Sequence, residues 1–435
     1  MRTALAYGRG SIDLELPDER LGAGARVELL EKHPVPAIHD PDAALRKALA
    51  APIDSSPLRE LARGRRDAVI VISDRTRPVP NAAILPPLLE ELRAGGLPLA
   101  AVTVLVATGL HRPNTPDELA EMLGGELARS LRIEQHDARD REAHIDLGRV
   151  GGIPVLIDRR YLESDLKILT GLIEPHLMAG YSGGRKAVCP GLAGVETVQV
   201  AHGPVMLEAQ VGPGIVEGNP LHAALLEVLE RAGADFLANV ALDRERRIAG
   251  VFCGDPVTAH AAGMRFVETE SLVSIAEPAD LVIVSGGGDP LDATFYQSIK
   301  GVSTASGIVR AGGVILLCAA LTEGIGSASF EKLLRETREP RDFELRLEDD
   351  GFFAVDQWMV QHLCQARRRA RVLMYTDGLP LEAAQELLVE ALPSPEAAVA
   401  RALDLSPVEP RIALVPQGPY VLATVNGEKR PLGAS

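Results

Sequence analysis

Residues 68–108, AVIVISDRTRPVPNAAILPPLLEELRAGGLPLAAVTVLVAT, hold two apolar runs on either side of an amphipathic segment. AVIVIS (68–73) is short and continuously apolar, which indicates a strand buried on both faces. A polar loop follows, and the spacing of apolar residues over 82–94 predicts a helix. AAVTVLVAT (100–108) predicts the next strand. This order favours two parallel strands joined by a helix that covers the sheet.

The same alternation continues along the chain. DLKILT (165–170) predicts another strand. ADFLANVAL (234–242) and RIAGVFCG (247–254) flank the polar DRER (243–246), a pattern typical of a hairpin. The segment 256–268 predicts a helix. Together with the first stretch, these elements predict an α/β domain with a mainly parallel sheet.

A second strand–helix–strand unit follows. It contains LVIVS (281–285), a helix near 294–311 and VILLCAA (314–320). Because 435 residues are too many for one ordinary core, two domains are expected. We predict two α/β domains with mainly parallel sheets, 1–272 and 273–435. The other C-terminal elements are predicted as helices around 357–373, 380–392 and 395–403 and a strand over 411–416.

The composition limits the classes of function. A hydrophobic content of 46% with 24% charged residues is typical of a soluble globular protein. The net charge of −15 argues against nucleic acid as a partner, because phosphate binding needs a basic surface. No apolar run is long enough for a secretion signal or a membrane span, so a cytoplasmic location is expected. The four cysteines form no CxxC pair, which indicates buried thiols.

Polar residues follow the predicted strands at the point where each strand ends. Because ligands of open α/β sheets bind beyond the carboxyl ends of the strands, these residues are candidates for a site. DRTRP follows the first strand, GLHRP the second and GLIEPH the third, and the second unit adds GGGDP and FYQSIK. The residues concerned are Asp74, Thr76, Arg77, His111, His176, Asp289, Tyr296, Gln297 and Lys300.

The stretch from His176 to His202 begins HLMAGYSGGRKAVCPG and combines two histidines, one lysine and five glycines. Lysine can carry a covalent adduct once its amine is neutral, and histidine can move protons or ligate a metal. Glycine lets the backbone approach a ligand. The stretch therefore favours a bound cofactor that the lysine could tether. A triphosphate-binding loop does not fit, because Arg185 stands at the second glycine position and Ala187 replaces the hydroxyl residue.

Each of these signals has a structural alternative. Asp74 could cap a helix, Arg77 could be a surface charge, and His111 could satisfy a backbone carbonyl. Asp289-Pro290 is a turn signal. We interpret the remaining histidines as structural or solvated: His33, His39, His136, His144, His222, His260 and His362.

A zinc hydrolase is a competing interpretation. His111, His176 and His202 could form a three-histidine zinc site. None of them lies in an HxH or HExxH pair. The arrangement also gives no role to Lys186 or to the arginines of the DRTRP loop.

The separated motifs together resemble the nickel-dependent lactate racemase family. Several motifs in one order are more specific than any single one. The resemblance implies a two-domain α/β protein with its active site in the cleft between the domains. The matching segments, in chain order, are SDRTRPVPN (73–81), ATGLHRP (107–113), GLIEPHLMAGYSGGRKAVCPG (171–191), His202, GGDP with FYQSIK (287–300) and DQWMVQ (356–361).

The resemblance also implies a cofactor, the nickel-pincer nucleotide. This is a pyridinium-3,5-bisthiocarboxylic acid mononucleotide that holds nickel through carbon and sulfur. In the family it is tethered to a lysine, which matches Lys186, and one histidine ligates the nickel, which matches His202. Gly183 and Gly184 would leave room for the mononucleotide. Separate biosynthetic proteins make and load the cofactor, so they are expected partners.

The implied reaction inverts the C2 centre of a 2-hydroxy acid, lactate or a related small acid, by reversible hydride transfer to the cofactor. His111 and His176 match the family's pair of alternating acid and base. Arg77 would hold the substrate carboxylate, and Lys300 could polarise the same region. The other assignments, to the cofactor or the pocket wall, are Asp74, Thr76, Tyr296, Gln297 and Trp358.

One alternative within the resemblance is a non-catalytic homologue that binds the cofactor or a small acid. The intact histidine pair argues against it, because pure binding does not need two proton shuttles. Cys189 stands where the family pattern leads us to expect an aliphatic residue. Either a reactive thiol near nickel or a small hydrophobe would fit that position. The motifs do not identify the side chain of the substrate.

Overall fold

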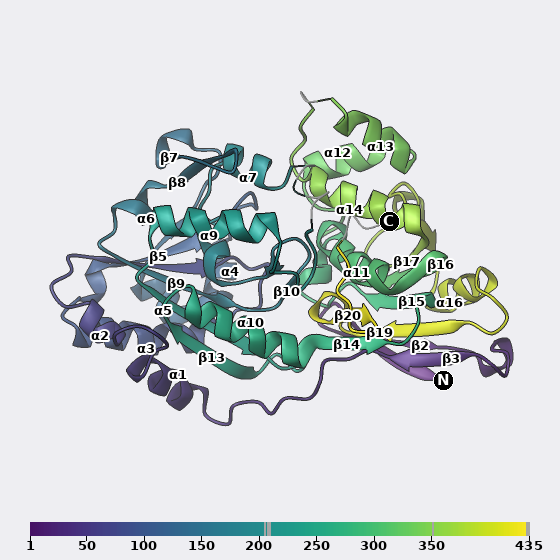
Figure 1. The fold of residues 1–435 in the computed structure, drawn as a ribbon, viewed down its shortest axis with the longest axis horizontal. Helices are drawn as coiled ribbons and strands as arrows, with labels where there is room; N and C mark the ends of the chain where they lie inside the picture. Colours follow the sequence, from purple (N-terminus) through teal and green to yellow (C-terminus); the bar gives the residue numbers. More distant parts are fainter. Residues whose placement is uncertain (204–205, 207–209, 350–351, 432–435) are drawn as a thin grey trace.

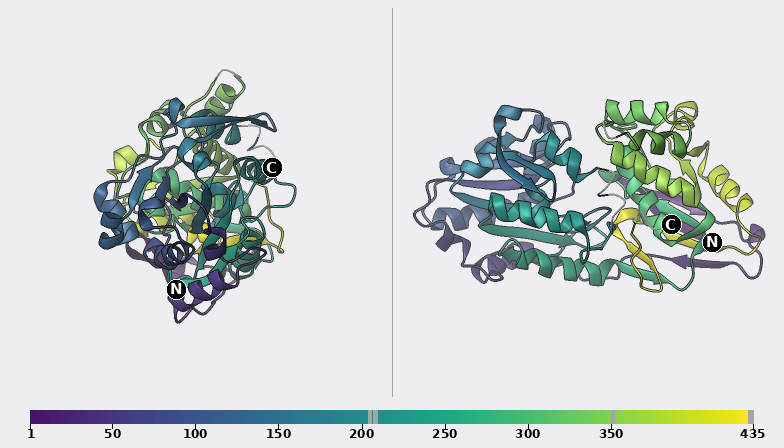
Figure 2. Two further views of the ribbon diagram at one scale, coloured as in Figure 1. Left: turned by 90° about the vertical axis from the view of Figure 1, so that its left-hand side faces the viewer. Right: turned by 45° about the horizontal axis from the view of Figure 1, so that its top comes forward.

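Two six-stranded sheets lie in two units that sit side by side (Figure 1 and the right-hand view of Figure 2). The computed structural model describes residues 1–203, 206, 210–349 and 352–431. Parallel pairing dominates both sheets, so the predicted fold class, two α/β units with mainly parallel sheets, is confirmed.

The first sheet shows why the apolar runs form strands. Val69 and Val71 pack into one hydrophobic cluster, whereas Ala68, Ile70 and Ile72 pack into another on the opposite face. Helix α9 (Pro220–Ala232) covers the first face and α3 (Asn81–Ala94) the second. Its strands, from edge to edge, are β13 (Ile248–Gly254), β12 (Phe236–Leu242), β9 (Leu166–Leu172), β4 (Ala68–Ser73), β5 (Val102–Ala107) and β6 (Arg132–Gln135).

The second sheet is parallel throughout its described pairs. Helices α11 (Phe295–Ile308) and α14 (Gln357–Arg369) pack on one face. Helix α16 (Pro395–Asp404) and the hairpin of β1 (Arg2–Tyr7) and β2 (Gly10–Glu15) cover the other. Its strands, from edge to edge, are β18 (Glu390–Leu392), β17 (Ala370–Tyr375), β16 (Val309–Cys318), β15 (Ala279–Ser285), β19 (Arg411–Val415) and β3 (Arg26–Leu29).

The beginning of the chain belongs in space to the second unit. The sequence prediction groups residues 1–30 with the first domain, but β3 pairs with β19, from Arg26 opposite Arg411 to Leu29 opposite Leu414. The β1–β2 hairpin packs on the same sheet. Local patterning gives no information about such a pairing between distant segments, which is why the prediction misplaces it.

Two predicted C-terminal helices are also wrong in part. The helix expected over 357–373 ends at Arg369, and residues 370–375 form β17. The helix expected over 380–392 consists of one turn, α15 (Leu381–Ala384), followed by β18. A short apolar run fits a buried strand as well as a helix, so periodicity alone misassigns it.

The two units are joined by shared packing and by the chain itself. Residues of both contribute to one hydrophobic cluster, and β14 (Leu272–Ile275), just after α10 (Thr258–Ser271), pairs with β20 (Leu422–Val425). Lys32 forms a buried ion pair with Glu270 at 2.5 Å along this connection. The other main elements are α1 (Pro41–Ala50), α2 (Leu58–Leu61), α4 (Pro116–Leu123), α5 (Gly125–Ser130), β7 (His144–Val150), β8 (Ile153–Asp158), α6 (Arg159–Glu163), β10 (Pro175–His176), β11 (Gly180–Tyr181), α7 (Val195–Ala201), α12 (Ala328–Glu336) and α13 (Pro340–Leu347). Among the helices of the described residues, we find none that combines the length and apolar character of a membrane span.

Candidate active site at the junction of the two units

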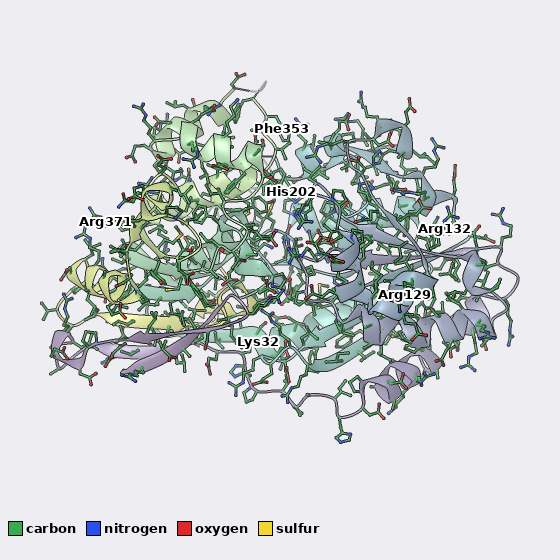
Figure 3. All side chains as sticks on the ribbon, turned by 180° about the vertical axis from the view of Figure 1, so that it is seen from behind. Lys32, Arg129, Arg132, His202, Phe353 and Arg371 are labelled. Atoms are coloured by element: carbon green, nitrogen blue, oxygen red, sulfur yellow. The ribbon has the colours of Figure 1, made fainter. Side chains whose placement is uncertain are left out.

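A cavity of about 150 Å³ lies where the carboxyl ends of the first sheet meet α11 and α14 of the second unit. In the view from behind, His202 lies at this junction (Figure 3). Every predicted site residue except Gly184 and Asp289 lines the cavity. A larger cavity of about 380 Å³ between α11, α14 and residues 421–431 contains none of them. The residues brought together are Asp74, Thr76, Arg77, His111, His176, Gly183, Lys186, His202, Tyr296, Gln297, Lys300 and Trp358.

His111 is oriented by Asp74 from the neighbouring strand end. The Nδ1 of His111 lies 2.6 Å from Oδ2 of Asp74, while Oδ1 accepts hydrogen bonds from the backbone N and Oγ1 of Thr76 at 3.2 and 2.6 Å. Burial alone would raise the pKa of Asp74, but the His111 ring and the Thr76 hydroxyl hold it below its usual value. Since a carboxylate only accepts, Nδ1 of His111 carries a proton, and in the neutral ring Nε2 is left as a proton acceptor.

His176 has the opposite arrangement. Its Nδ1 accepts hydrogen bonds from the backbone N of Met178 and of Ala179, each at 3.2 Å. In the neutral ring the proton is then on Nε2. Burial, followed by nearby cationic side chains, lowers the pKa of His176 well below its usual value. The neutral ring of His176 therefore presents an N–H, whereas His111 presents a lone pair.

Lys186 lies on the 3-10 turn Gly184–Ala187 and faces the cavity. Burial, with a smaller effect from the charge of Arg77, lowers the pKa of its amine to about 7. A large share of this amine is therefore neutral at physiological pH, and a neutral lysine is the form that makes a covalent bond. The position and chemistry of Lys186 suit a covalently held ligand.

His202 presents one nitrogen for metal binding. It is buried at the end of α7, and its Nδ1 donates to the backbone O of Val198 at 3.0 Å, which leaves the lone pair on Nε2. Burial lowers the pKa of His202 to about 3, so the ring is neutral. Within the described ranges no group of three or more His, Cys, Asp or Glu side chains is arranged to hold a metal. The three-histidine zinc site finds no support there.

The second unit closes the cavity with side chains from two helices. Gln297 and Lys300 are three residues apart on α11 and therefore lie on one helix face. Burial, followed by the charge of Arg77, lowers the pKa of Lys300 well below its usual value. The Nε1 of Trp358 donates to the hydroxyl of Tyr296 at 2.9 Å. The Trp358 ring lies 4.9 Å from that of His202, between centroids.

Sequence reasoning assigned no role to Glu174, which contacts Arg77 directly. Glu174 follows β9, and its Oε1 lies 3.2 Å from Nε of Arg77. It also missed Asp356, which lines the cavity and accepts a hydrogen bond from Ser327 at 2.5 Å. Both residues lie inside motifs that match the family, GLIEPH and DQWMVQ. Their place in these motifs is the sequence feature that could have identified them as site residues.

Packing explains why Gly183 and Gly184 are glycines. A Cβ on Gly183 would lie 2.6 Å from Oδ1 of Asn239, and one on Gly184 would lie 2.5 Å from the ring of His260. Both have a positive φ, so other residues would be strained there. Gly184 lies behind the cavity lining. Its expected contact with a cofactor is therefore replaced by packing against His260.

Cys189 and five of the histidines interpreted as structural or solvated are buried, namely His136, His144, His222, His260 and His362, whereas His33 and His39 are exposed. Burial raises the pKa of Cys189 to about 12, so its thiol stays protonated and packs as a small apolar group. His136 contacts Asp158 at 2.9 Å and the backbone O of Ala193 at 3.1 Å. Asp289 lies outside the cavity lining, and its backbone O accepts a hydrogen bond from Arg246.

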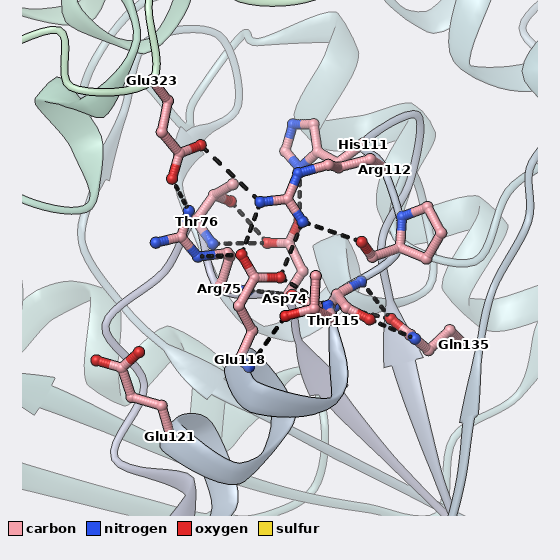
Figure 4. A network of polar contacts seen from close by, with 12 residues as sticks. Asp74, Arg75, Thr76, His111, Arg112, Thr115, Glu118, Glu121, Gln135 and Glu323 are labelled. Carbon is pink, nitrogen blue, oxygen red and sulfur yellow. Dashed lines mark hydrogen bonds and ion pairs between the residues drawn. The ribbon is translucent and has the colours of Figure 1, made fainter.

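A network of ion pairs forms the rim of the site (Figure 4). Arg112, next to His111, donates to both carboxylate oxygens of Glu118 at 2.8 and 2.6 Å. Arg75 contacts the same carboxylate at 3.2 Å. Glu323, which follows β16 in the second unit, pairs with Arg75 and lies 3.9 Å from Arg112. The rim network, Arg75, Arg112, Glu118 and Glu323, therefore links the two units outside the cavity.

The chain matches family models in both units. The model of the lactate racemase N-terminal domain matches residues 7–213, and that of the lactate racemase C-terminal domain matches residues 274–423. The lactate racemase of Thermoanaerobacterium thermosaccharolyticum is 32% identical over 432 residues, covering 96% of this chain and 98% of the relative. That of Lactiplantibacillus plantarum is 32% identical over 376 residues, with coverage of 86% and 88%.

Solved structures agree with the sequence matches. The lactate racemase apoprotein of T. thermosaccharolyticum superposes with a TM-score of 0.88 at 31% identity, covering 97% of this chain and all of the other. A protein from Thermotoga maritima shares the fold, with a TM-score of 0.68 at 19% identity and coverage of 89% and 97%. The matches span both units and nearly the whole chain, and so the chain belongs to the lactate racemase family.

Proposed function

We propose that the protein is a racemase or epimerase that inverts the C2 centre of a small 2-hydroxy acid, lactate or a close relative. The observation that carries the proposal is the pair of histidines on one cavity, because His111 offers a lone pair and His176 offers an N–H. A 2-hydroxy acid has a carboxylate and a hydroxyl. Arg77 and Lys300 suit the carboxylate, and the histidines suit the hydroxyl.

The proton moves between stated atoms. Nε2 of His111 takes the hydroxyl proton of one enantiomer, and the Asp74 carboxylate stabilises the resulting imidazolium. Together with loss of the C2 hydrogen as hydride, which the bound cofactor would accept, this gives a 2-keto acid, which rotates while Arg77 holds its carboxylate. His176 serves the other enantiomer, for which its Nδ1 must give up the contacts to the backbone amides of Met178 and Ala179. The two histidines thereby alternate as base and acid.

The residues present fit the nickel-pincer nucleotide. Lys186 has an amine that is partly neutral near pH 7, which suits the tether, and His202 has a free Nε2, which suits one bond to nickel. A cofactor that brings its own donors needs only one from the protein, in keeping with the absence of a three-ligand group among the described residues. When bound, this cofactor supplies the acceptor that takes the C2 hydrogen as hydride and returns it to either face.

The proposal is tested by loading the protein with the cofactor and incubating it with single enantiomers of lactate and other 2-hydroxy acids. Intact mass and nickel content establish the loading, and optical rotation follows the inversion. We expect both enantiomers of one acid to racemise. If no acid is inverted by fully loaded protein, the racemase proposal fails and a carrier of the cofactor becomes the better interpretation. Bound zinc without added mass on Lys186 would overturn the cofactor assignment.

A further inference from the structure

We propose that Glu174 is a positioning residue, which acts through Arg77 to set the orientation of the substrate carboxylate. The inference rests on the proposed function, in which Arg77 binds that carboxylate. It concerns a residue to which neither the sequence motifs nor the proposed mechanism gives a task.

The guanidinium of Arg77 is held on two of its edges. Its Nε lies 3.2 Å from Oε1 of Glu174, and its Nη1 donates to the backbone O of Thr76 at 3.1 Å. Among the described residues, no hydrogen bond involves Nη2. The fork is planar and rigid, so fixing two edges also fixes the direction of the third. Arg77 lines the cavity, and the free edge is the one available to a ligand there.

Glu174 stands on a rigid support. Its backbone N donates to Oγ of Ser182 at 3.0 Å, and its backbone O accepts a hydrogen bond from the N of Ser182 at 2.9 Å. The same hydroxyl donates to the backbone O of Leu172 at 2.8 Å. These bonds tie the end of β9 to the turn that carries Lys186. The carboxylate therefore reaches Arg77 from a fixed backbone, as positioning requires.

Glu174 also offsets the positive charge of the Arg77 guanidinium. Arg77, Lys186 and Lys300 lie near one another, and of the carboxylates that act on Lys300, Asp74 is already bound to His111. Glu174 is thus the carboxylate left to offset the charge of Arg77. Its side chain is only 10% exposed, so water screens this contact weakly.

The second oxygen of Glu174 is left open. Oε2 is buried and has no hydrogen-bond partner among the described residues, and the same holds for the hydroxyl of Tyr420 from the second unit. Both residues line a cavity of about 10 Å³ and a separate one of about 90 Å³, neither of which is the cavity that holds Lys186 and His202. One oxygen therefore lies against Arg77, and the other stays open to these neighbouring spaces.

The test is a double-mutant cycle in the cofactor-loaded enzyme. Glu174→Ala should raise KM for the 2-hydroxy acid by about 10- to 100-fold, the size expected for coupling between contacting residues of a buried ion pair, with a much smaller change in kcat. Glu174→Gln keeps an acceptor oxygen and should raise KM less. Arg77→Ala combined with Glu174→Ala should be no worse than Arg77→Ala alone, because Glu174 acts only through Arg77.

A matched control is Glu134→Gln on β6. Glu134 pairs with Arg160 at 2.8 Å outside the cavity, so KM should not change. If the effects of Arg77→Ala and Glu174→Ala multiply in the double variant, Glu174 does not act through Arg77 and the inference fails. If Arg77→Ala leaves KM unchanged, the assignment of Arg77 in the proposed function fails instead. Should Glu174→Ala not fold, Glu174→Gln and Glu174→Asp carry the same cycle.

Discussion

Arg75 and Arg77 lie two residues apart on one loop, yet they enter two different electrostatic environments. Arg77 lines the buried cavity and pairs beside it with Glu174, and the two side chains are 16% and 10% exposed. Arg75 is itself only 22% exposed, but it joins the rim network, in which Glu323 is 41% and Arg112 is 54% exposed. Water and salt screen the rim contacts but reach the buried contact poorly. An ion pair should therefore affect the reaction where it is buried beside the cavity, whereas a similar pair at the rim should contribute little to stability.

The largest effect should come from the buried amine. Lys186→Ala should lower activity by roughly 1000-fold or more, because no covalent attachment remains, while the fold is retained. Turnover and intact mass after loading are the measurements. Lys186→Arg is the control, since it keeps a cation that cannot form the bond. Full activity of either variant would contradict the tether.

The next effect concerns the partner of His111. Asp74→Asn should lower kcat by about 100- to 10,000-fold, because an amide no longer fixes the Nδ1 proton or stabilises the imidazolium. Steady-state kinetics with each enantiomer measures this loss. Asp117→Asn, at an exposed position on α4, is the control and should behave as the parent protein. Unchanged kcat in Asp74→Asn would show that Asp74 does not orient His111.

The buried region should also determine how the protein responds to acid. Burial lowers the pKa of His202 and His260 to about 3, and that of His222 and His362 to about 4. The unfolded chain binds these protons near pH 6.5, so the stability is present above that pH and is lost as the pH falls toward the folded values. The loss should be roughly 1 kcal/mol per histidine between pH 6.5 and 5.5.

Urea unfolding across this pH range checks the expectation. His362→Asn should flatten the pH dependence, whereas substitution of the exposed His39 should not. A free energy of unfolding that is constant from pH 7.5 to 5.5 would mean that these rings are accessible to protons in the folded protein.

The smallest effect should come from the rim. Glu323→Gln removes the carboxylate that links the units, yet exposed pairs contribute only about 0.2–1 kcal/mol. We expect a slightly lower melting temperature at low salt and no difference from the parent at about 1 M salt, where charges are screened within a few ångströms. A rise in KM as large as that from Glu174→Ala would mean that the rim network holds the cavity closed.

The sequence predicts the parts of the fold that local patterns encode. Continuous apolar runs identify β4, β5, β9 and β15, because each is buried on both faces. The same rule fails at β17, whose short apolar run follows directly from α14. The pairing of β3 with β19 joins segments far apart in the chain, and no local pattern contains that information.

The site was predictable where residue type and strand end coincide. Arg77, His111 and His176 follow strands, so the rule for open sheets finds them. The contact of Glu174 with Arg77 depends on how neighbouring strand ends align. The tautomer of His111 depends on the Asp74 carboxylate, and that of His176 depends on backbone amides. Sequence shows the residue types but not these directions.

The pairing of β3 with β19 also sets an order of assembly. The first sheet uses strands between Ala68 and Gly254, so all its strands exist before residues 255–435 are made. The second sheet needs β3 from the beginning and β19 from near the end. During synthesis, β3 therefore stays unpaired until β19 has been made, and unpaired strand edges are prone to aggregate. A growing chain can hold Lys186 and His202 long before α11 and α14 close the cavity around them.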